Sequence, residues 1–164
     1  MTTKATSSPA EPTTTAAAAN RGRHVFVTGV TGFVGKVVLA ELLRRKDELV
    51  IDRITVLVRN KRGQTPEQRF DEAAKSRCFA RLSPGWRRMV DVVAGELSQP
   101  GCGLTRTDIA TLRRGITHVV HCAASVEFDL PVADAAAANI TSSMNMLELF
   151  RPAAVLQHMV FVST

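Results

Sequence analysis

The stretch TGVTGFVGK, from Thr28 to Lys36, decides the fold of this chain. It follows a β-branched run at 24–28 and leads into residues 35–48, whose apolar side chains recur at helical spacing. Glycines at such a junction let a strand turn tightly into a helix, let backbone amides approach a pyrophosphate, and let the helix pack closely on a sheet. The stretch therefore predicts a dinucleotide-binding loop, with a glycine-rich turn that binds nothing as the alternative. A Walker A loop is excluded, because the spacing is wrong and Val37 stands where a Ser or Thr would bind Mg²⁺.

Short apolar runs alternate with helical patterns along the rest of the chain. Further strands are predicted at 54–58, 89–93, 116–122 and 158–163, and further helices at 65–82, 105–115 and 131–150. This order predicts an α/β fold, a Rossmann-like doubly wound parallel sheet. A buried parallel strand with no following crossover helix would leave an edge uncovered. We therefore expect the fold to be truncated after the fifth strand, and the chain to be incomplete at Thr164.

Composition divides the chain into two parts. Residues 1–22 are mostly Thr, Ala, Ser and Pro, which predicts a disordered tail; a transit peptide is the alternative, but the segment is not rich in arginine. Residues 23–164 then form one nucleotide-binding domain. The three cysteines form no CxxC pair, which argues against a zinc site or disulfide framework and indicates a reducing compartment. No apolar run approaches the roughly 20 residues that span a bilayer.

The charge balance is basic, with 21 Lys and Arg against 15 Asp and Glu. A net charge of +6 is compatible with a nucleic acid partner, because basic proteins attract phosphates. No nucleic-acid-binding module accompanies the charge, and aromatic residues make up only 5% of the chain, none of them tyrosine. We therefore expect no nucleic acid partner, since phosphorylated cofactors and substrates explain the sign equally well.

The end of the second strand predicts which cofactor is bound. NAD enzymes place an Asp or Glu there for the ribose 2′-hydroxyl, whereas an Arg accommodates the 2′-phosphate of NADP. Here the strand ends in Val58-Arg59-Asn60-Lys61-Arg62, and no acidic residue follows until Glu67. The sequence favours NADP, with a solvated basic loop as the alternative.

Several motifs in order resemble one known family. The runs VFVTGVTGFVGKVVLAELLRR, ITVLVRNKRGQTPEQRF, VAGELSQPGCGLT, THVVHCAASVEFDLPVADAAAANI and VFVST are similar to the N-terminal NADP-binding part of fatty acyl-CoA reductases, members of the extended short-chain dehydrogenase/reductase superfamily. The resemblance covers 24–164. Thioester reductase domains of carboxylic acid reductases share much of the pattern and remain an alternative.

The resemblance implies a set of site residues. Glu96 is a departure, because the family usually has Asp before Leu97, and the longer side chain puts the contact with adenine in question. Thr164, in Val162-Ser163-Thr164, matches the catalytic hydroxyl that hydrogen-bonds the substrate carbonyl. The cofactor-binding residues implied are Gly29, Thr31, Gly32, Phe33, Val34 and Gly35 for the pyrophosphate, Arg59 for the 2′-phosphate, Glu96 and Leu97 for adenine, Ala123 and Ala124 along the cofactor, and Asn139 as a support; no metal is implied.

The resemblance also implies a reaction. NADPH would reduce a long-chain acyl-CoA thioester through the aldehyde to a fatty alcohol, with this chain as the cofactor-binding part. The family's catalytic tyrosine, and the lysine four residues later that lowers its pKa, are absent from the chain, so we expect residues 1–164 alone to be inactive. A catalytically inactive NADP-binding module is a further alternative. The resemblance implies an intracellular protein that is peroxisomal or associated with the endoplasmic reticulum, with the cytoplasm as the alternative. Its membrane association would depend on regions outside this chain.

Overall fold

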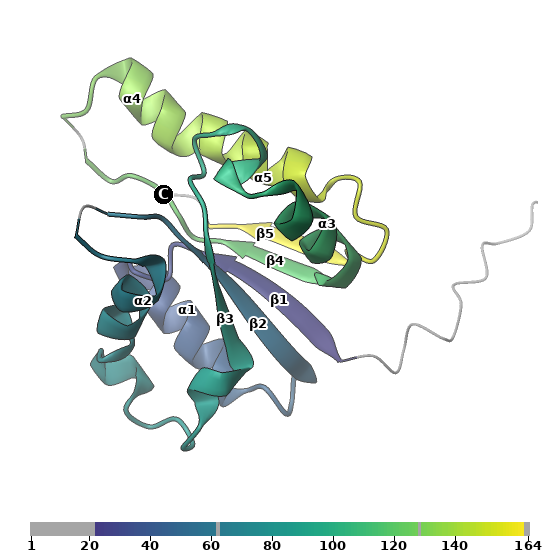
Figure 1. Cartoon of the computed structure of the whole chain (residues 1–164). Helices are drawn as coiled ribbons and strands as arrows, with labels where there is room; N and C mark the ends of the chain where they lie inside the picture. The colour runs from purple at the N-terminus through teal and green to yellow at the C-terminus, as the bar shows by residue number, and fades with distance from the viewer. Residues whose placement is uncertain (1–21, 62, 128, 163–164) are drawn as a thin grey trace, which may run out of the picture.

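The fold is a five-stranded parallel sheet between two layers of helices (Figure 1). The computed structural model describes residues 22–61, 63–127 and 129–162. The strand order is β3-β2-β1-β4-β5, the order of the first five strands of a dinucleotide-binding sheet. The predicted doubly wound α/β sheet is confirmed. The strands are β1 (Arg23–Thr28), β2 (Ile51–Val58), β3 (Val90–Ala94), β4 (His118–His121) and β5 (His158–Phe161).

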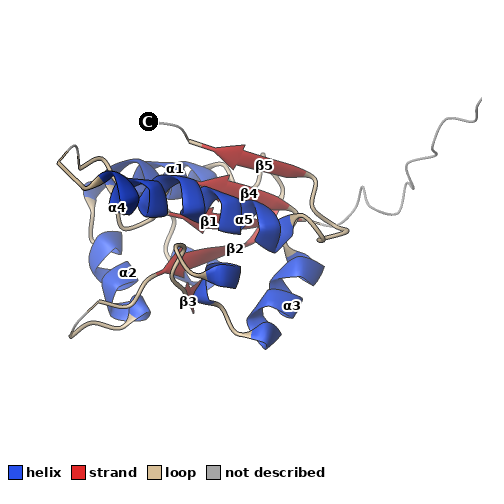
Figure 2. Cartoon of the chain, turned by 90° about the horizontal axis from the view of Figure 1, so that it is seen from above, coloured by secondary structure: helices blue, strands red, loops and turns tan. Residues whose placement is uncertain are grey.

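Helices cover both faces of the sheet (Figure 2). Side chains of α1 and α2 pack on one face, and those of α3 and α5 pack on the other. The crossovers from β1 to β2 and from β2 to β3 therefore lie on one face, and those from β3 to β4 and from β4 to β5 lie on the other. The helices are α1 (Phe33–Arg44), α2 (Pro66–Ala74), α3 (Arg106–Gly115), α4 (Val132–Ala136) and α5 (Ser142–Phe150), with short turns η2 (Arg77–Phe79), η3 (Trp86–Met89), η4 (Pro100–Gly103) and the π-helical η5 (Ala137–Thr141).

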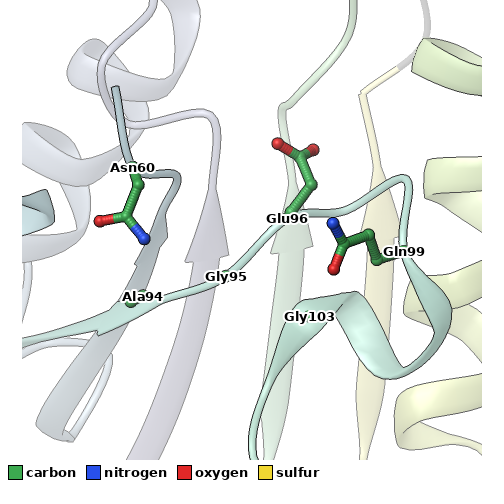
Figure 3. A pocket seen from close by; sticks show the side chains of 6 residues that line it. All are labelled: Asn60, Ala94, Gly95, Glu96, Gln99 and Gly103. Atoms are coloured by element: carbon green, nitrogen blue, oxygen red, sulfur yellow. The ribbon is translucent and has the colours of Figure 1, made fainter. Parts of the chain in front are cut away.

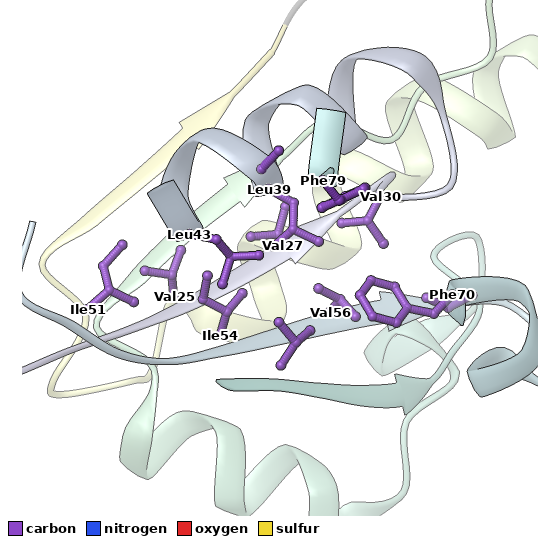
Figure 4. Close-up of a cluster of buried hydrophobic side chains, with 13 residues drawn as sticks. Val25, Val27, Val30, Leu39, Leu43, Ile51, Ile54, Val56, Phe70 and Phe79 are labelled. Atoms are coloured by element: carbon purple, nitrogen blue, oxygen red, sulfur yellow. The ribbon is translucent and has the colours of Figure 1, made fainter. Parts of the chain in front are cut away.

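Alternate residues of the central strand serve two separate cores. Val25 and Val27 of β1 lie under α1 with Leu39 and Leu43, as Figure 4 shows. Phe26 points to the other face, where its ring lies 5.1 Å from that of Phe150 of α5. A strand buried on both faces reads as a continuous apolar run, which explains the sequence of 25–27.

The helix predicted over 65–82 starts as expected but is wrong beyond Ala74. Thr65 accepts a hydrogen bond from the Gln68 amide, and the Gln68 side chain accepts one from the Thr65 amide, so the predicted capping box is present. The chain then leaves the helix and forms η2, which buries Phe79 with its ring stacked 5.0 Å from Trp86. Packing of these rings against the sheet overrides the helical periodicity.

The other boundaries shift by a few residues. The helix predicted over 35–48 spans 33–44, and the strand predicted over 116–122 is shortened to 118–121. The helix predicted over 131–150 is present but contains the π-helical turn at 137–141. The tail predicted over 1–22 lies outside the described residues except for Gly22. Within the described ranges, no helix combines the length and apolar character needed to cross a bilayer.

Candidate functional site

The predicted site residues gather at the carboxyl ends of the strands. The strand order reverses between β1 and β4, since β2 lies on one side of β1 and β4 on the other. In open parallel sheets, ligands bind in the crevice outside the strand ends at this reversal. The loops at 29–32 and 122–131 leave β1 and β4 at that point.

Gly29 of the first loop and Gly35 of the first turn of α1 hold positions where a side chain would collide with the backbone. Gly29 has φ +75°, and a Cβ there would lie 2.7 Å from the Ala123 nitrogen of the second loop. A Cβ on Gly35 would lie 2.2 Å from the Gly29 carbonyl oxygen. The first glycine lets the two loops touch, and the second lets α1 pack against its own entry turn.

The first turn of α1 offers free backbone donors. Its N-cap residue is Gly32, no side chain caps the helix, and the first turn contains no acidic residue. The side chain of Phe33 is 82% exposed and that of Val34 is also exposed, while Thr31 is half-buried. Uncapped amide groups and the positive end of the helix dipole can together bind an anion.

Two arginines meet at the end of β2. Arg59 is exposed and immediately follows the strand. Arg69 of α2 donates a hydrogen bond from Nη1 to the Arg59 carbonyl oxygen at 2.5 Å. Burial lowers the pKa of Arg69, and the nearby Arg59 charge lowers it further. Neither guanidinium forms an ion pair with a carboxylate among the described residues, so both charges are available to an anion.

Sequence reasoning missed Arg69. The available signal was the short connection between β2 and the capping box, because α2 begins at Pro66, only eight residues after Val58. A helix that starts so soon after a strand has its first turns at the same edge of the sheet. Arg69 is four residues after the N-cap Thr65, about one turn into α2, and its side chain therefore reaches the end of β2.

A pocket of about 290 Å³ lies beside this strand end (Figure 3). Asn60 lines one side of it, and Glu96 and Gln99 line the other. Asn145 of α5 donates hydrogen bonds to the carbonyl oxygens of Leu97 at 2.8 Å and Gln99 at 3.0 Å. The loop that carries Glu96 and Leu97 is thus tied to a helix on the sheet, a contact that the sequence did not reveal.

The loop after β4 is held by Asn139. The Asn139 side chain accepts a hydrogen bond from the Ser125 amide at 2.7 Å and donates one to the Ser125 carbonyl oxygen at 3.1 Å. Asn139 lies within the π-helical turn η5, a type of turn often found at functional sites. This pair of bonds fixes the path of the chain just after Ala123 and Ala124.

Cys122 is the first residue of that loop and does not have the character of a nucleophile. Burial raises the pKa of its thiol, so the thiol stays protonated near neutral pH. The predicted catalytic residue, Thr164, lies outside the described residues. Over 22–61, 63–127 and 129–162, no three His, Cys, Asp or Glu side chains come together as metal ligands.

A family model described as "Male sterility protein" matches residues 27–164. The chain belongs to this family. Its NAD-binding character agrees with the glycine loop, the uncapped helix and the strand order described above. The match begins inside β1 and covers every element of the sheet that follows.

Curated proteins similar to this chain are named fatty acyl-CoA reductases. The chain is 37% identical over 146 residues to fatty acyl-CoA reductase 1 of Gallus gallus and 34% identical to that of Homo sapiens. It is 30% identical over 147 residues to fatty acyl-CoA reductase wat of Drosophila melanogaster. Each alignment covers 87–88% of this chain but only 28% of the relative, so the chain spans just over a quarter of the length of these proteins.

Solved structures of reductase domains share the fold. The terminal R domain of the myxalamid PKS-NRPS pathway has a TM-score of 0.73 and 29% identity, over 88% of this chain and 35% of that one. The R domain of a non-ribosomal peptide synthetase from Mycobacterium tuberculosis has a TM-score of 0.67 and 28% identity, over 87% of this chain and 33% of that one. The chain is therefore a nicotinamide-cofactor-binding region of the reductase type.

Proposed function

We propose that this chain is the NADP-binding region of a fatty acyl-CoA reductase, and that the whole protein reduces long-chain acyl-CoA to fatty alcohol through the aldehyde. The choice of NADP rests on one observation: Arg59 and Arg69 lie together at the end of β2, and neither forms an ion pair with a carboxylate of the described residues. A ribose 2′-phosphate brings two negative charges to this position, and guanidinium groups bind phosphate through charged, forked hydrogen bonds. No acidic residue stands there to select a 2′-hydroxyl instead.

The remaining cofactor contacts follow from the neighbouring loops. The amides at the start of α1, in the turn that contains Gly32, Phe33 and Val34, hold the pyrophosphate. The pocket bordered by Asn60 and Glu96 takes the adenine. One Glu96 oxygen accepts a hydrogen bond from the Ser98 hydroxyl at 3.2 Å, which leaves the other oxygen free to meet the adenine amino group. Ala123 and Ala124 extend along the cofactor, and Asn139 supports that loop through Ser125.

The bound NADPH supplies the hydride that reduces the thioester carbonyl. In this chain, Thr164 holds that carbonyl through its hydroxyl group. The chain contains no tyrosine to serve as the proton donor expected in this family, so residues 1–164 bind the cofactor without completing the reaction. The similarity to fatty acyl-CoA reductases is also our basis for proposing that the protein acts at the peroxisome or the endoplasmic reticulum.

A carrier-bound thioester is the second candidate substrate. The reason is the likeness to the R domains of peptide and polyketide synthetases, with a TM-score of up to 0.73 at 29% identity. The relation to fatty acyl-CoA reductases is stronger in sequence, at 37% identity over a similar share of the chain. We therefore place acyl-CoA first.

A domain exchange tests whether this segment works as the cofactor-binding region of a fatty acyl-CoA reductase. Residues 24–164 replace the matching segment of chicken fatty acyl-CoA reductase 1, and NADPH oxidation is followed with palmitoyl-CoA and with the same acyl group on a carrier protein. We expect the hybrid to form hexadecanol from palmitoyl-CoA, while residues 1–164 alone oxidise no NADPH. A hybrid that oxidises no NADPH with either thioester would argue against this cofactor-binding role, and turnover by 1–164 would contradict the missing proton donor.

A further inference from the structure

A buried histidine faces the hydroxyl group that joins the two cofactor loops. Thr28 is the last residue of β1, His121 is the last residue of β4, and the two are paired in the sheet register. The Thr28 Oγ1 atom lies 2.8 Å from His121 Nδ1. Thr28 is fully buried and His121 is 2% exposed. Gly29 follows Thr28 directly, so this contact lies immediately below the first loop.

The same hydroxyl reaches the second loop. The Ala123 amide donates a hydrogen bond to Thr28 Oγ1 at 3.3 Å. One oxygen atom thus connects the end of β1, the end of β4 and the second residue beyond β4. The backbones of the two loops are in contact here, since a side chain at Gly29 would collide with the Ala123 nitrogen. The position of the Thr28 hydroxyl therefore sets the spacing of the two loops.

The available donors and acceptors show which atom donates in the contact between Thr28 and His121. Since Thr28 Oγ1 accepts from the Ala123 amide, its own hydrogen is best used by donation to His121 Nδ1. The ring proton then lies on Nε2, which has no partner among the described residues. The opposite tautomer leaves both Nε2 and the hydroxyl hydrogen without partners, which is worse in a buried site. Burial also lowers the pKa of His121, so the ring is neutral and can accept at Nδ1.

We propose that His121 is a positioning residue for the cofactor: it accepts the hydrogen bond of Thr28 and thereby holds the loop at Ala123 against the loop at Gly29. This role rests on the proposed cofactor function. It differs from the 2′-phosphate contact of Arg59, because the two loops would contact parts of the cofactor that NADPH and NADH have in common. Loss of the imidazole acceptor therefore weakens binding of NADPH and NADH by the same factor.

The chain contains a matched pair for comparison. His24 Nε2 lies 2.8 Å from Thr55 Oγ1, and Thr55 is 3% exposed. This second histidine–threonine contact joins the second residue of β1 to the middle of β2, and neither residue belongs to the two cofactor loops. Substitution of His24 thus removes a similar hydrogen bond from the same sheet without disturbing the cofactor loops.

The test measures equilibrium binding of NADPH and NADH to the purified chain, together with the melting temperature of each variant. We expect His121→Leu to weaken both dinucleotides about three- to tenfold, the size of one lost hydrogen bond. We expect His121→Asn, whose amide oxygen can accept in place of Nδ1, to recover most of this loss. We expect His24→Leu to lower the melting temperature while leaving both affinities unchanged.

A double substitution shows whether His121 acts through the hydroxyl. In a Thr28→Val background, His121→Leu should produce no further loss of affinity. If the wild-type chain binds NADPH, two results would overturn the role of His121 and leave the proposed function intact. One is unchanged binding by His121→Leu, and the other is an equal loss of affinity in His24→Leu. Failure of the wild-type chain to bind either dinucleotide would overturn the proposed function and this role with it.

Discussion

Arg69 donates a hydrogen bond from its Nη1 atom to the backbone carbonyl oxygen of Arg59 at 2.5 Å. Two cationic residues are thereby held together at the end of β2, although like charges in proximity are unfavourable without an anion between them. The cost is visible in the lowered pKa of Arg69, whose causes are burial and the Arg59 charge. An arrangement of this kind favours a bound phosphate, which would neutralise both groups.

The first prediction concerns Arg69 itself. Arg69→Met keeps most of the side-chain length but removes the charge, and we expect it to weaken NADPH binding about tenfold while NADH binding changes little. Arg81→Met, at an exposed position between η2 and η3, is the control for a loss of one positive charge. Equal losses for both dinucleotides would show that Arg69 supports the fold of the site and does not contact the 2′-phosphate.

The second prediction concerns the glycine at the start of α1. Gly35→Ala would place a Cβ 2.2 Å from the Gly29 carbonyl oxygen, which forces the helix away from its entry turn. We expect a lower melting temperature and loss of measurable dinucleotide binding. Gly32→Ala is the control, since its Cβ would lie 3.3 Å from the same oxygen and requires only a small shift. Similar effects of the two substitutions, measured by calorimetry, would contradict the packing described for Gly35.

The third prediction concerns stability against pH. Burial is the largest cause of a lowered pKa for His24, His118 and His121, with Arg53 and Arg23 lowering those of His24 and His118 further. The pKa of such a histidine is 6.5 in the unfolded chain and lower in the folded chain. As the pH falls, the unfolded chain therefore binds the proton before the folded chain does. Stability is therefore expected to fall as the pH drops below about 6.5.

Melting temperatures measured between pH 7.5 and 5.5 test this sign. The range stays above the titration of carboxylates, so the histidines dominate the change. His121→Asn removes one of the three groups and should give a shallower dependence on pH than the wild-type chain. A melting temperature that rises toward pH 5.5, or an identical slope in the variant, would be the opposite of the expected result.

Local signals in the sequence predicted the features that depend on neighbouring residues. The capping box at Thr65 and Gln68 formed as expected, because both partners lie within one helical turn. The alternation of strand and helix correctly predicted the parallel sheet, since each apolar run had the length and periodicity of its element. The end of α2 was not predicted, because the stacking of Phe79 on Trp86 is a tertiary contact.

Contacts between distant residues escaped prediction for the same reason. Thr28 and His121 are separated by 93 positions, and Leu97 and Asn145 by 48, so nothing in their local sequence indicates that they meet. The strand ends of a parallel sheet could be predicted to converge, but the choice of side chains that bond across the edge depends on register and loop path. The glycine loop and Arg59 were predicted as site residues because their roles follow from position along a single strand and turn. Their roles as ligands remain predictions.

The measurement that most directly tests the proposed cofactor role is a titration of the chain with NADPH and with NADH, before and after Arg59→Glu. We predict that the wild-type chain binds NADPH more tightly than NADH. We expect the substitution to weaken NADPH about 10- to 100-fold, the range for hydrogen bonds to a charged group, while NADH is almost unaffected. Equal losses for the two dinucleotides, or a wild-type chain that prefers NADH, would contradict an NADP-binding region.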